Sequence, residues 1–238
     1  MIRLPRAKQL QARGKDDNIT FTCNTMIIIR GRVTCKCHFP GGAREEALPV
    51  DSWEALKSEC AGCRRCSLCE TRHKLVFGVG NEKSQILLVG EGPGEQEDLL
   101  GEPFVGPAGK LLDDMLKMID LDRGMVYIAN TVKCRPPGNR DPLGVEQDAC
   151  REWLDRQIAL LDPKIIVCLG RIAAKALIDP DFRITREHGV WYDIDGRRCM
   201  ATYHPSALLR DLSRRPEAFM DLRSLRKEIK AVCDGVYV

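Results

Sequence analysis

Short apolar runs alternate with longer segments of helical spacing through most of this chain. The runs QILLVG (85–90), MVYIAN (125–130) and KIIVCLG (164–170) are almost wholly apolar, as strands buried on both faces are. Residues 107–119 and 145–161 instead carry apolar side chains three and four positions apart, which predicts amphipathic helices. This order of strands and helices predicts a mostly parallel sheet with helices on both faces.

Four further segments complete the predicted domain. The stretch DSWEALKSEC predicts a helix with Asp51 or Ser52 as its N-cap. The other three are a helix that follows residue 170, a hairpin that turns at Asp195-Gly196, and an amphipathic helix over residues 219–232.

Residues 1–50 differ from the rest of the chain. They carry nine Lys and Arg against four Asp and Glu, they contain one short strand-like run, and PGGAREEALP reads as a linker. Such a composition rarely buries a core. We therefore expect a basic N-terminal extension over residues 1–50, either disordered, an accessory arm or an over-extended start, followed by one domain over residues 51–238.

The overall composition argues against a membrane or secreted protein but does not identify the function. Hydrophobic residues make up 44% of the chain and charged residues 30%, which is typical of a soluble globular protein. No apolar run approaches the roughly 18 residues of a membrane span, and the N-terminus lacks the features of a secretory signal. We expect a reducing cytosol, where clustered cysteines more often bind metal or act in redox than form disulfides. The net charge of +3 neither requires nor excludes nucleic-acid binding.

Polar side chains follow three of the predicted strands. Glu91 comes directly after the first, Asn130 ends the second, and His204 follows the last strand of the hairpin. Ligands of parallel sheets bind outside the carboxyl ends of the strands. Any one of these residues alone would more often be a loop cap or a core hydrogen-bond partner. Together they predict a site that combines a carboxylate, an amide and an imidazole.

The stretch GEGPGEQEDLLGEPFVGPAG (90–109) is rich in Gly and Pro, which suggests a rigid backbone that a ligand can approach closely. It is not a Walker loop, because no Gly-Lys-Ser/Thr follows, and it lacks the G-x-G-x-x-G spacing. Phe104 is a large apolar residue within it. Such an aromatic either stacks on a flat ring or plugs the core.

Four cysteines at a spacing of three occupy CAGCRRCSLC (60–69). They are compatible with a metal site, half of one, or a disulfide cluster. A zinc ribbon would need a second C-x2-C pair. Cys134 and Cys150 are instead sixteen residues apart, which suits an iron–sulfur cluster held by scattered thiolates. The residues alone leave the choice among the four open.

Three motifs together resemble one known family. GEGPGEQED with EPFVGPAG, NTVKCRPPGNRDP (130–142) and YHPSALL (203–209) are similar, in order and spacing, to the family 4 uracil-DNA glycosylases, which contain an iron–sulfur cluster. The resemblance covers about residues 53–232. It implies a three-layer α/β/α sandwich with a four-stranded, mostly parallel central sheet, and a DNA glycosylase that starts base excision repair of deaminated cytosine.

The resemblance also implies a ligand set. Counting back from FGVGN, which begins at Phe77, selects Cys63 and Cys66, and the later pair matches Cys134 and Cys150. These four would hold a 4Fe–4S cluster that ties together the loops contacting DNA. A register that uses Cys60 with Cys63, or Cys66 with Cys69, stays open.

The implied reaction is hydrolysis of the bond between uracil N1 and deoxyribose, after the base has left the stack. Asn130 would read the uracil edge, Phe104 would stack on the ring, and backbone N–H groups near Gly92 would bond O2. His204 would donate to O2 as negative charge builds there. Glu91 would orient the attacking water or stabilise the cationic sugar.

One further residue is implied for specificity. Glu97 matches the family position beside uracil C5, where a side chain excludes the thymine methyl group. Its alternative role is a loop-ordering ion pair.

Either Leu208 or Leu209 would wedge into the gap in the duplex, unless they simply pack a helix start. The DNA contacts that we expect are Arg135, Arg140, Ser206, Leu209 and Arg210, and Arg214 and Arg215 would also hold phosphates.

The expected partner is uracil-containing DNA, single- or double-stranded, and no membrane. We expect a monomer in the cytoplasm, associated with the nucleoid. Two other classes of protein fit parts of the sequence: a non-catalytic iron–sulfur or zinc protein that binds nucleic acid, and a small α/β hydrolase that acts on nucleosides or nucleotides.

Overall fold

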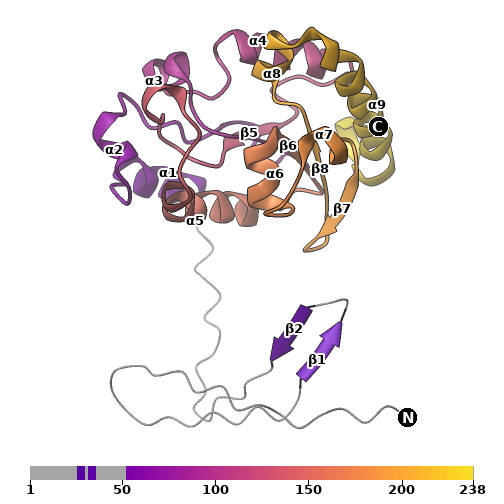
Figure 1. Ribbon diagram of the computed structural model, residues 1–238, viewed down its shortest axis with the longest axis horizontal. Coiled ribbons are helices and arrows are strands. Elements are labelled where there is room, and N and C mark those ends of the chain that lie inside the picture. The colour runs from indigo at the N-terminus through magenta and orange to yellow at the C-terminus, as the bar shows by residue number, and fades with distance from the viewer. Residues whose placement is uncertain (1–25, 30–31, 36–51, 238) are drawn as a thin grey trace. The chain divides into compact units, whose positions relative to one another are not determined.

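The computed structural model describes residues 26–29, 32–35 and 52–237, and the chain divides into two units between residues 47 and 48 (Figure 1). In the first unit, β1 (Met26–Ile29) pairs with β2 (Arg32–Cys35) as an antiparallel hairpin. The remainder of the expected basic extension over residues 1–50 lies outside the described residues.

The second unit is built on a sheet of six strands in the order β3-β5-β4-β6-β8-β7. The strands are β3 (Val79–Gly80), β4 (Ile86–Gly90), β5 (Tyr127–Asn130), β6 (Ile165–Leu169), β7 (Trp191–Ile194) and β8 (Arg197–Thr202). The four inner strands run parallel, whereas β3 and β7 pair antiparallel at the two edges. The fold class is confirmed, but the expected count of four strands is too low, because two antiparallel edge strands extend the parallel core.

Helices surround this sheet. They are α1 (Trp53–Ala61), α2 (Leu68–Thr71), α3 (Glu95–Leu100), α4 (Pro107–Lys117), α5 (Gly144–Leu161), α6 (Arg171–Leu177), α7 (Ile184–Glu187), α8 (Pro205–Arg210) and α9 (Arg215–Val232). Three short 3-10 helices, η1 (Pro137–Asn139), η2 (Leu212–Arg214) and η3 (Gly235–Tyr237), complete the described elements. None of the helices in the described part of the chain is long and apolar enough to span a membrane.

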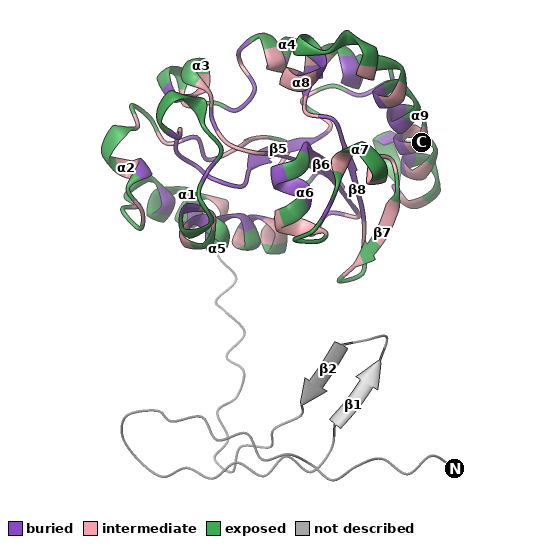
Figure 2. Ribbon diagram, viewed as in Figure 1, coloured by how far each residue is buried: buried purple, intermediate pink, exposed green. Residues whose placement is uncertain are grey.

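The strand β4 shows why this sheet is buried on both faces. Successive side chains of a strand point to opposite faces. Ile86 and Leu88 accordingly pack in one apolar cluster with α4 and α9, and Leu87 and Val89 pack in another with α5 and α6. The inner strands and the inward faces of the helices are buried, and the outward faces are exposed (Figure 2). Both faces must be covered by helices, so the free space for a ligand lies at the ends of the strands.

The helices begin at, or within a few residues of, the positions predicted from the sequence. Ser52 is the N-cap of α1, and its hydroxyl accepts from the Ala55 backbone N–H at 3.1 Å. The last helix, α9, begins at Arg215, four residues earlier than predicted. The helix α3 was not predicted, because it lies within the Gly- and Pro-rich stretch that reads as a loop.

Candidate active site

A cavity of about 410 Å³ opens at the carboxyl edge of the sheet, and its lining draws on the ends of all four parallel strands. Glu91 follows β4, and Asn130 ends β5. Gly170 follows β6, and His204 lies two residues beyond β8. The carboxylate, the amide and the imidazole that the sequence predicts therefore line one cavity.

Asn130 has an unused hydrogen-bond acceptor. Only 2% of the residue is exposed, and its side-chain Oδ1 has no hydrogen-bond partner among the residues that the structure describes. A Cβ at Gly90 would come within 2.4 Å of this oxygen and 2.7 Å of Phe104 Cζ, so only glycine fits between the two side chains. A buried acceptor without a donor costs about 1–3 kcal/mol, which points to a ligand that supplies an N–H or O–H group.

Phe104 is held in a strained backbone conformation beside Asn130. Its φ is +55°, in the left-handed region that bulky residues rarely adopt. The Arg123 guanidinium donates to the carbonyl oxygens of Pro103 and Phe104 and so holds this turn. Phe104 is 5% exposed, packs on the core and also lines the cavity, so it plugs the core, and stacking on a flat ring stays a prediction.

His204 faces the Phe104 ring, with ring centroids 5.5 Å apart and planes 28° from parallel. Its Nδ1 accepts from the Ser206 backbone N–H at 3.1 Å and lies 2.7 Å from the Ser206 hydroxyl. Burial and, to a smaller extent, the Arg210 charge lower the pKa of His204 to about 4, while Glu97 opposes the shift. The imidazole is therefore neutral at pH 7, and because Nδ1 accepts, its proton lies on Nε2.

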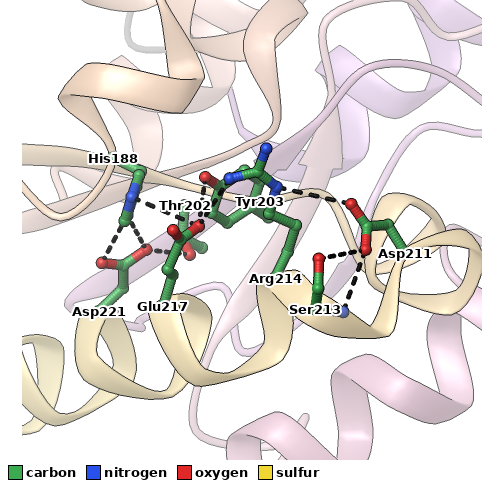
Figure 3. Close-up of polar contacts among 8 residues, drawn as sticks. All are labelled: His188, Thr202, Tyr203, Asp211, Ser213, Arg214, Glu217 and Asp221. Atoms are coloured by element: carbon green, nitrogen blue, oxygen red, sulfur yellow. Dashed lines mark hydrogen bonds and ion pairs between the residues drawn. The ribbon is translucent and has the colours of Figure 1, made fainter.

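A polar network fixes the strand end that carries His204 (Figure 3). Thr202 donates to the Asp221 carboxylate at 2.6 Å, and Tyr203 donates to the Glu217 carboxylate at 2.7 Å. Both carboxylates come from α9, one turn apart. His188 also contacts Asp221, with Nδ1 3.0 Å from each carboxylate oxygen. These residues were not predicted from the sequence, although two acidic residues at i and i+4 on an amphipathic helix were a usable signal.

Glu91 is half-buried in the cavity. Burial raises the pKa of its carboxyl group, and the negative charge of Asp141 raises it further, whereas Arg171 and Arg210 oppose the shift. The side chains of Asp141 and Arg171 also line the cavity, and the sequence analysis singled out neither of them. No sequence motif around these two residues indicates a site, because only the tertiary structure brings them close to Glu91.

Glu97 orders the Gly- and Pro-rich segment. Its carboxylate accepts from the backbone N–H groups of Gly94 (3.1 Å), Val105 (2.9 Å) and Gly106 (2.9 Å). The loop-ordering alternative thus operates through backbone hydrogen bonds rather than through the expected ion pair. Glu97 lines the cavity as well, and its expected position beside uracil C5 stays a prediction. Gly92 also lines the cavity, where a Cβ would meet Val132 Cγ2 at 2.8 Å.

The expected DNA contacts lie in different surroundings. Arg140 lines the cavity, but its two terminal nitrogens bond Glu146 at 2.7 and 2.8 Å, and Glu146 is almost fully buried. Arg135 bonds Asn139 at 2.8 Å and does not line the cavity. Both guanidinium groups therefore already make hydrogen bonds within the protein, to Asn139 and to Glu146.

The remaining expected contacts come from α8. Ser206 and Arg210 line the cavity, and Arg210 is exposed, whereas the Ser206 hydroxyl bonds His204. Leu209 lies outside the cavity lining and is 41% exposed, while Leu208 is buried in the core. Of the two candidate wedge residues, only Leu209 is therefore accessible to a duplex.

The four predicted ligand cysteines lie around one apolar cluster beside α1 and α5. Three of the sulfurs accept from N–H groups: Trp153 Nε1 to Cys63 (3.3 Å), Arg72 Nη1 to Cys134 (3.2 Å), and the Lys133 backbone N to Cys150 (3.3 Å). N–H groups directed at sulfur stabilise thiolates and tune iron–sulfur centres. In the described part of the chain, no three His, Cys, Asp or Glu side chains are placed to hold a single metal ion.

Cys60 and Cys69, which the implied ligand set leaves out, differ from these four. Cys60 is fully buried in the same apolar cluster, and Cys69 lies in the short helix α2. Among the described residues, no N–H group donates to the sulfur of either one. The cysteines of residues 60–69 are free thiols, so the disulfide alternative is not formed.

Comparison with known proteins gives one consistent result. The family model described as the uracil DNA glycosylase superfamily matches residues 77–224. A type-4 uracil-DNA glycosylase of Archaeoglobus fulgidus is 45% identical over 192 residues, which are 77% of this chain and 94% of that protein. A type-4 uracil-DNA glycosylase of Sulfurisphaera tokodaii is 44% identical over 75% of this chain and 85% of that protein. A type-5 uracil-DNA glycosylase of Thermus thermophilus is 34% identical over 55% of this chain and 68% of that protein.

Proposed function

The chain belongs to the type-4 branch of the uracil DNA glycosylase superfamily, and from this we propose that it removes uracil from DNA. The enzyme takes a uracil nucleotide out of the base stack and hydrolyses the bond between uracil N1 and deoxyribose. The products are free uracil and an abasic site, which is the first intermediate in base excision repair of deaminated cytosine.

The unpartnered amide oxygen of Asn130 is the observation that carries this proposal. Uracil presents an N3–H donor beside the O4 acceptor. The Asn130 amide is complementary, because its Oδ1 accepts and its Nδ2 donates. Cytosine presents the opposite pattern at both positions and would leave buried polar groups unpaired. The adjacent Phe104 ring supplies a flat surface on which the base stacks.

Two side chains act on the bond that breaks. The neutral His204 ring donates from Nε2–H to uracil O2, where negative charge develops as the bond lengthens. A ring of lowered pKa suits this role, since it stabilises the oxyanion as a donor and does not transfer its proton completely. Glu91 faces the same cavity and orients the attacking water or stabilises the cationic sugar.

Cys63, Cys66, Cys134 and Cys150 would hold the 4Fe–4S cluster of this branch. Support comes from the three N–H groups directed at the sulfurs of Cys63, Cys134 and Cys150. These four residues would tie the segment around α2 to α5 and to the segment after β5, and the cluster would serve there as a cross-link without transferring electrons in the hydrolysis. The proposed ligand thiolates thus fix the backbone that leads to Arg135 and Arg140.

Iron content tests this ligand set. The purified protein should be brown and contain about four irons per chain. Cys63→Ser and Cys134→Ser should lose the colour and most of the iron, since each removes a thiolate. Cys69→Ser is the matched control and should keep both. Stoichiometric zinc in place of iron, or equal iron in all three variants, would contradict the proposed ligands.

Base release tests the function itself. A labelled single-stranded oligonucleotide with one deoxyuridine should yield free uracil and an abasic site, and the same oligonucleotide with thymidine should yield no base. Binding of both oligonucleotides without release would instead favour a nucleic-acid-binding protein. Release of uracil from free deoxyuridine, at a rate similar to that from DNA, would favour a nucleosidase.

A further inference from the structure

An ion pair between Asp141 and Arg171 spans one side of the cavity. Asp141 belongs to the segment that follows β5, and Arg171 is the first residue of α6, directly after β6. The strand β4 lies between β5 and β6 in the sheet. The pair therefore joins the segments that follow the two neighbours of β4, and both of its charges act on Glu91, which follows β4 and lines the cavity.

This pair differs from the pair that Arg140 makes at the same cavity. Glu146, the partner of Arg140, is 2% exposed in its side chain, so releasing Arg140 would leave a buried carboxylate with only a backbone N–H donor and no opposite charge. The side chains of Asp141 and Arg171 are 53% and 49% exposed. Water can solvate Asp141 at once if Arg171 leaves it. Exposed pairs of this kind change an equilibrium constant by about fivefold or less.

We propose that Arg171 binds a backbone phosphate of DNA, and that Asp141 occupies the place of that phosphate until DNA arrives. The inference rests on the proposed function, because it takes DNA as the substrate. A guanidinium group matches a carboxylate and a phosphate with the same two-pronged geometry. Arg171 exchanges one for the other, and phosphate binding also releases counterions from the DNA.

The Asp141–Arg171 pair lies where the phosphates of an entering nucleotide would arrive, so Arg171 would exchange Asp141 for phosphate as the substrate binds. A nucleotide that enters the cavity brings its phosphates to the rim, where Arg171 and the exposed Arg210 stand. Asp141 and Glu91 are both acidic and both line the cavity, so in the free protein the positive charge of Arg171 offsets their mutual repulsion. Asp141 consequently weakens DNA binding, although the pair is attractive within the free protein.

The test measures DNA affinity apart from base release. The probe is a fluorescent single-stranded oligonucleotide with 2′-fluoro-2′-deoxyuridine, whose glycosidic bond resists cleavage, titrated by anisotropy at several salt concentrations. Asp141→Asn should tighten binding by up to about fivefold, because it frees Arg171. Arg171→Gln should weaken binding about tenfold and reduce the magnitude of the salt slope by about 0.7. In the Arg171→Gln background, Asp141→Asn should have a clearly smaller effect.

Asp162→Asn is the matched control. Asp162 is an exposed aspartate paired with Arg197 at 2.7 Å, and it precedes β6, at the opposite edge of the sheet from the cavity. Its φ of +44° is one that asparagine also adopts readily. This variant removes the same charge, and its DNA affinity should equal that of the wild type.

Three results would overturn the inference. Equal affinities of Asp141→Asn and Asp162→Asn would show that only net charge matters. Weaker binding by Asp141→Asn would show that the pair holds the rim of the cavity in shape. If Asp141→Asn fails to fold, as judged by thermal melting, Arg171→Gln decides alone, and an unchanged salt slope refutes the proposal. Failure of the proposed function would appear separately, as wild-type protein that releases no uracil.

Discussion

His204→Ala is expected to reduce the rate of uracil release about 10²–10³-fold, because the variant lacks the donor to uracil O2. The affinity for the uncleaved oligonucleotide should change little, since the ring acts on charge that appears only as the bond breaks. Single-turnover release from a deoxyuridine oligonucleotide measures the rate, and anisotropy measures the affinity.

His73→Ala is the control for this variant. The His73 side chain is 64% exposed and does not line the cavity, and the backbone N–H of residue 73 still donates to the buried Asp98 in the variant, so the rate should stay unchanged. A wild-type rate in His204→Ala would show that the imidazole has been assigned wrongly. A loss of DNA affinity equal to the loss of rate would show that the ring binds substrate rather than the transition state.

The pH dependence provides a second measurement on the same ring. The folded pKa of His204 is about 4, below the value of 6.5 for a free histidine. The neutral form therefore persists as the pH falls from 8 to 6, and the rate should not decline through protonation of His204 in that range. The stability that burial of a neutral ring confers is complete above pH 6.5 and falls towards pH 4. A decline in rate with a midpoint near 6.5 that is absent in His204→Ala would contradict this assignment.

Asn130→Asp should lower uracil release about 10²-fold and lower the preference for uracil over cytosine to a similar extent. A carboxylate can still accept from N3–H, but it has no donor for O4. It also places a negative charge beside a base that becomes negative as the bond breaks. Release from matched oligonucleotides with deoxyuridine or deoxycytidine measures both quantities.

Asn139→Asp is the matched control for Asn130→Asp. Asn139 also lines the cavity, but it is exposed at the rim and bonds Arg135. The same change of chemistry there should leave the preference for uracil intact. If Asn130→Asp also keeps that preference, the edge-reading role of Asn130 is wrong.

Local patterns in the sequence were sufficient to predict the scaffold and the three polar groups at its edge. The apolar runs that become β4, β5 and β6 allow no solvent-exposed face, so helices must cover both sides. Parallel strands then place their carboxyl ends along one edge. Glu91, Asn130 and His204 lie in one cavity because each lies at, or within two residues of, the carboxyl end of a parallel strand, and chain direction alone determines which edge they share.

Contacts across long stretches of the chain were decided only by the tertiary structure. The edge strand β3 has two residues, too few for any periodicity, and it exists because Val79 pairs with Ile128. The sequence predicts that Arg140 contacts a phosphate, and only the fold shows that it also pairs with the buried carboxylate of Glu146.

The ion pair between Asp141 and Arg171 joins residues thirty positions apart. The carboxylates of α9 reach Thr202 and Tyr203 only because that helix packs against the end of β8. The partner of a charged side chain depends on which elements pack together, and the local pattern of apolar and polar residues does not contain that information. The chain's own sequence thus predicted where the reactive groups would gather, and the packing of distant elements decided how they are held and which charges surround them.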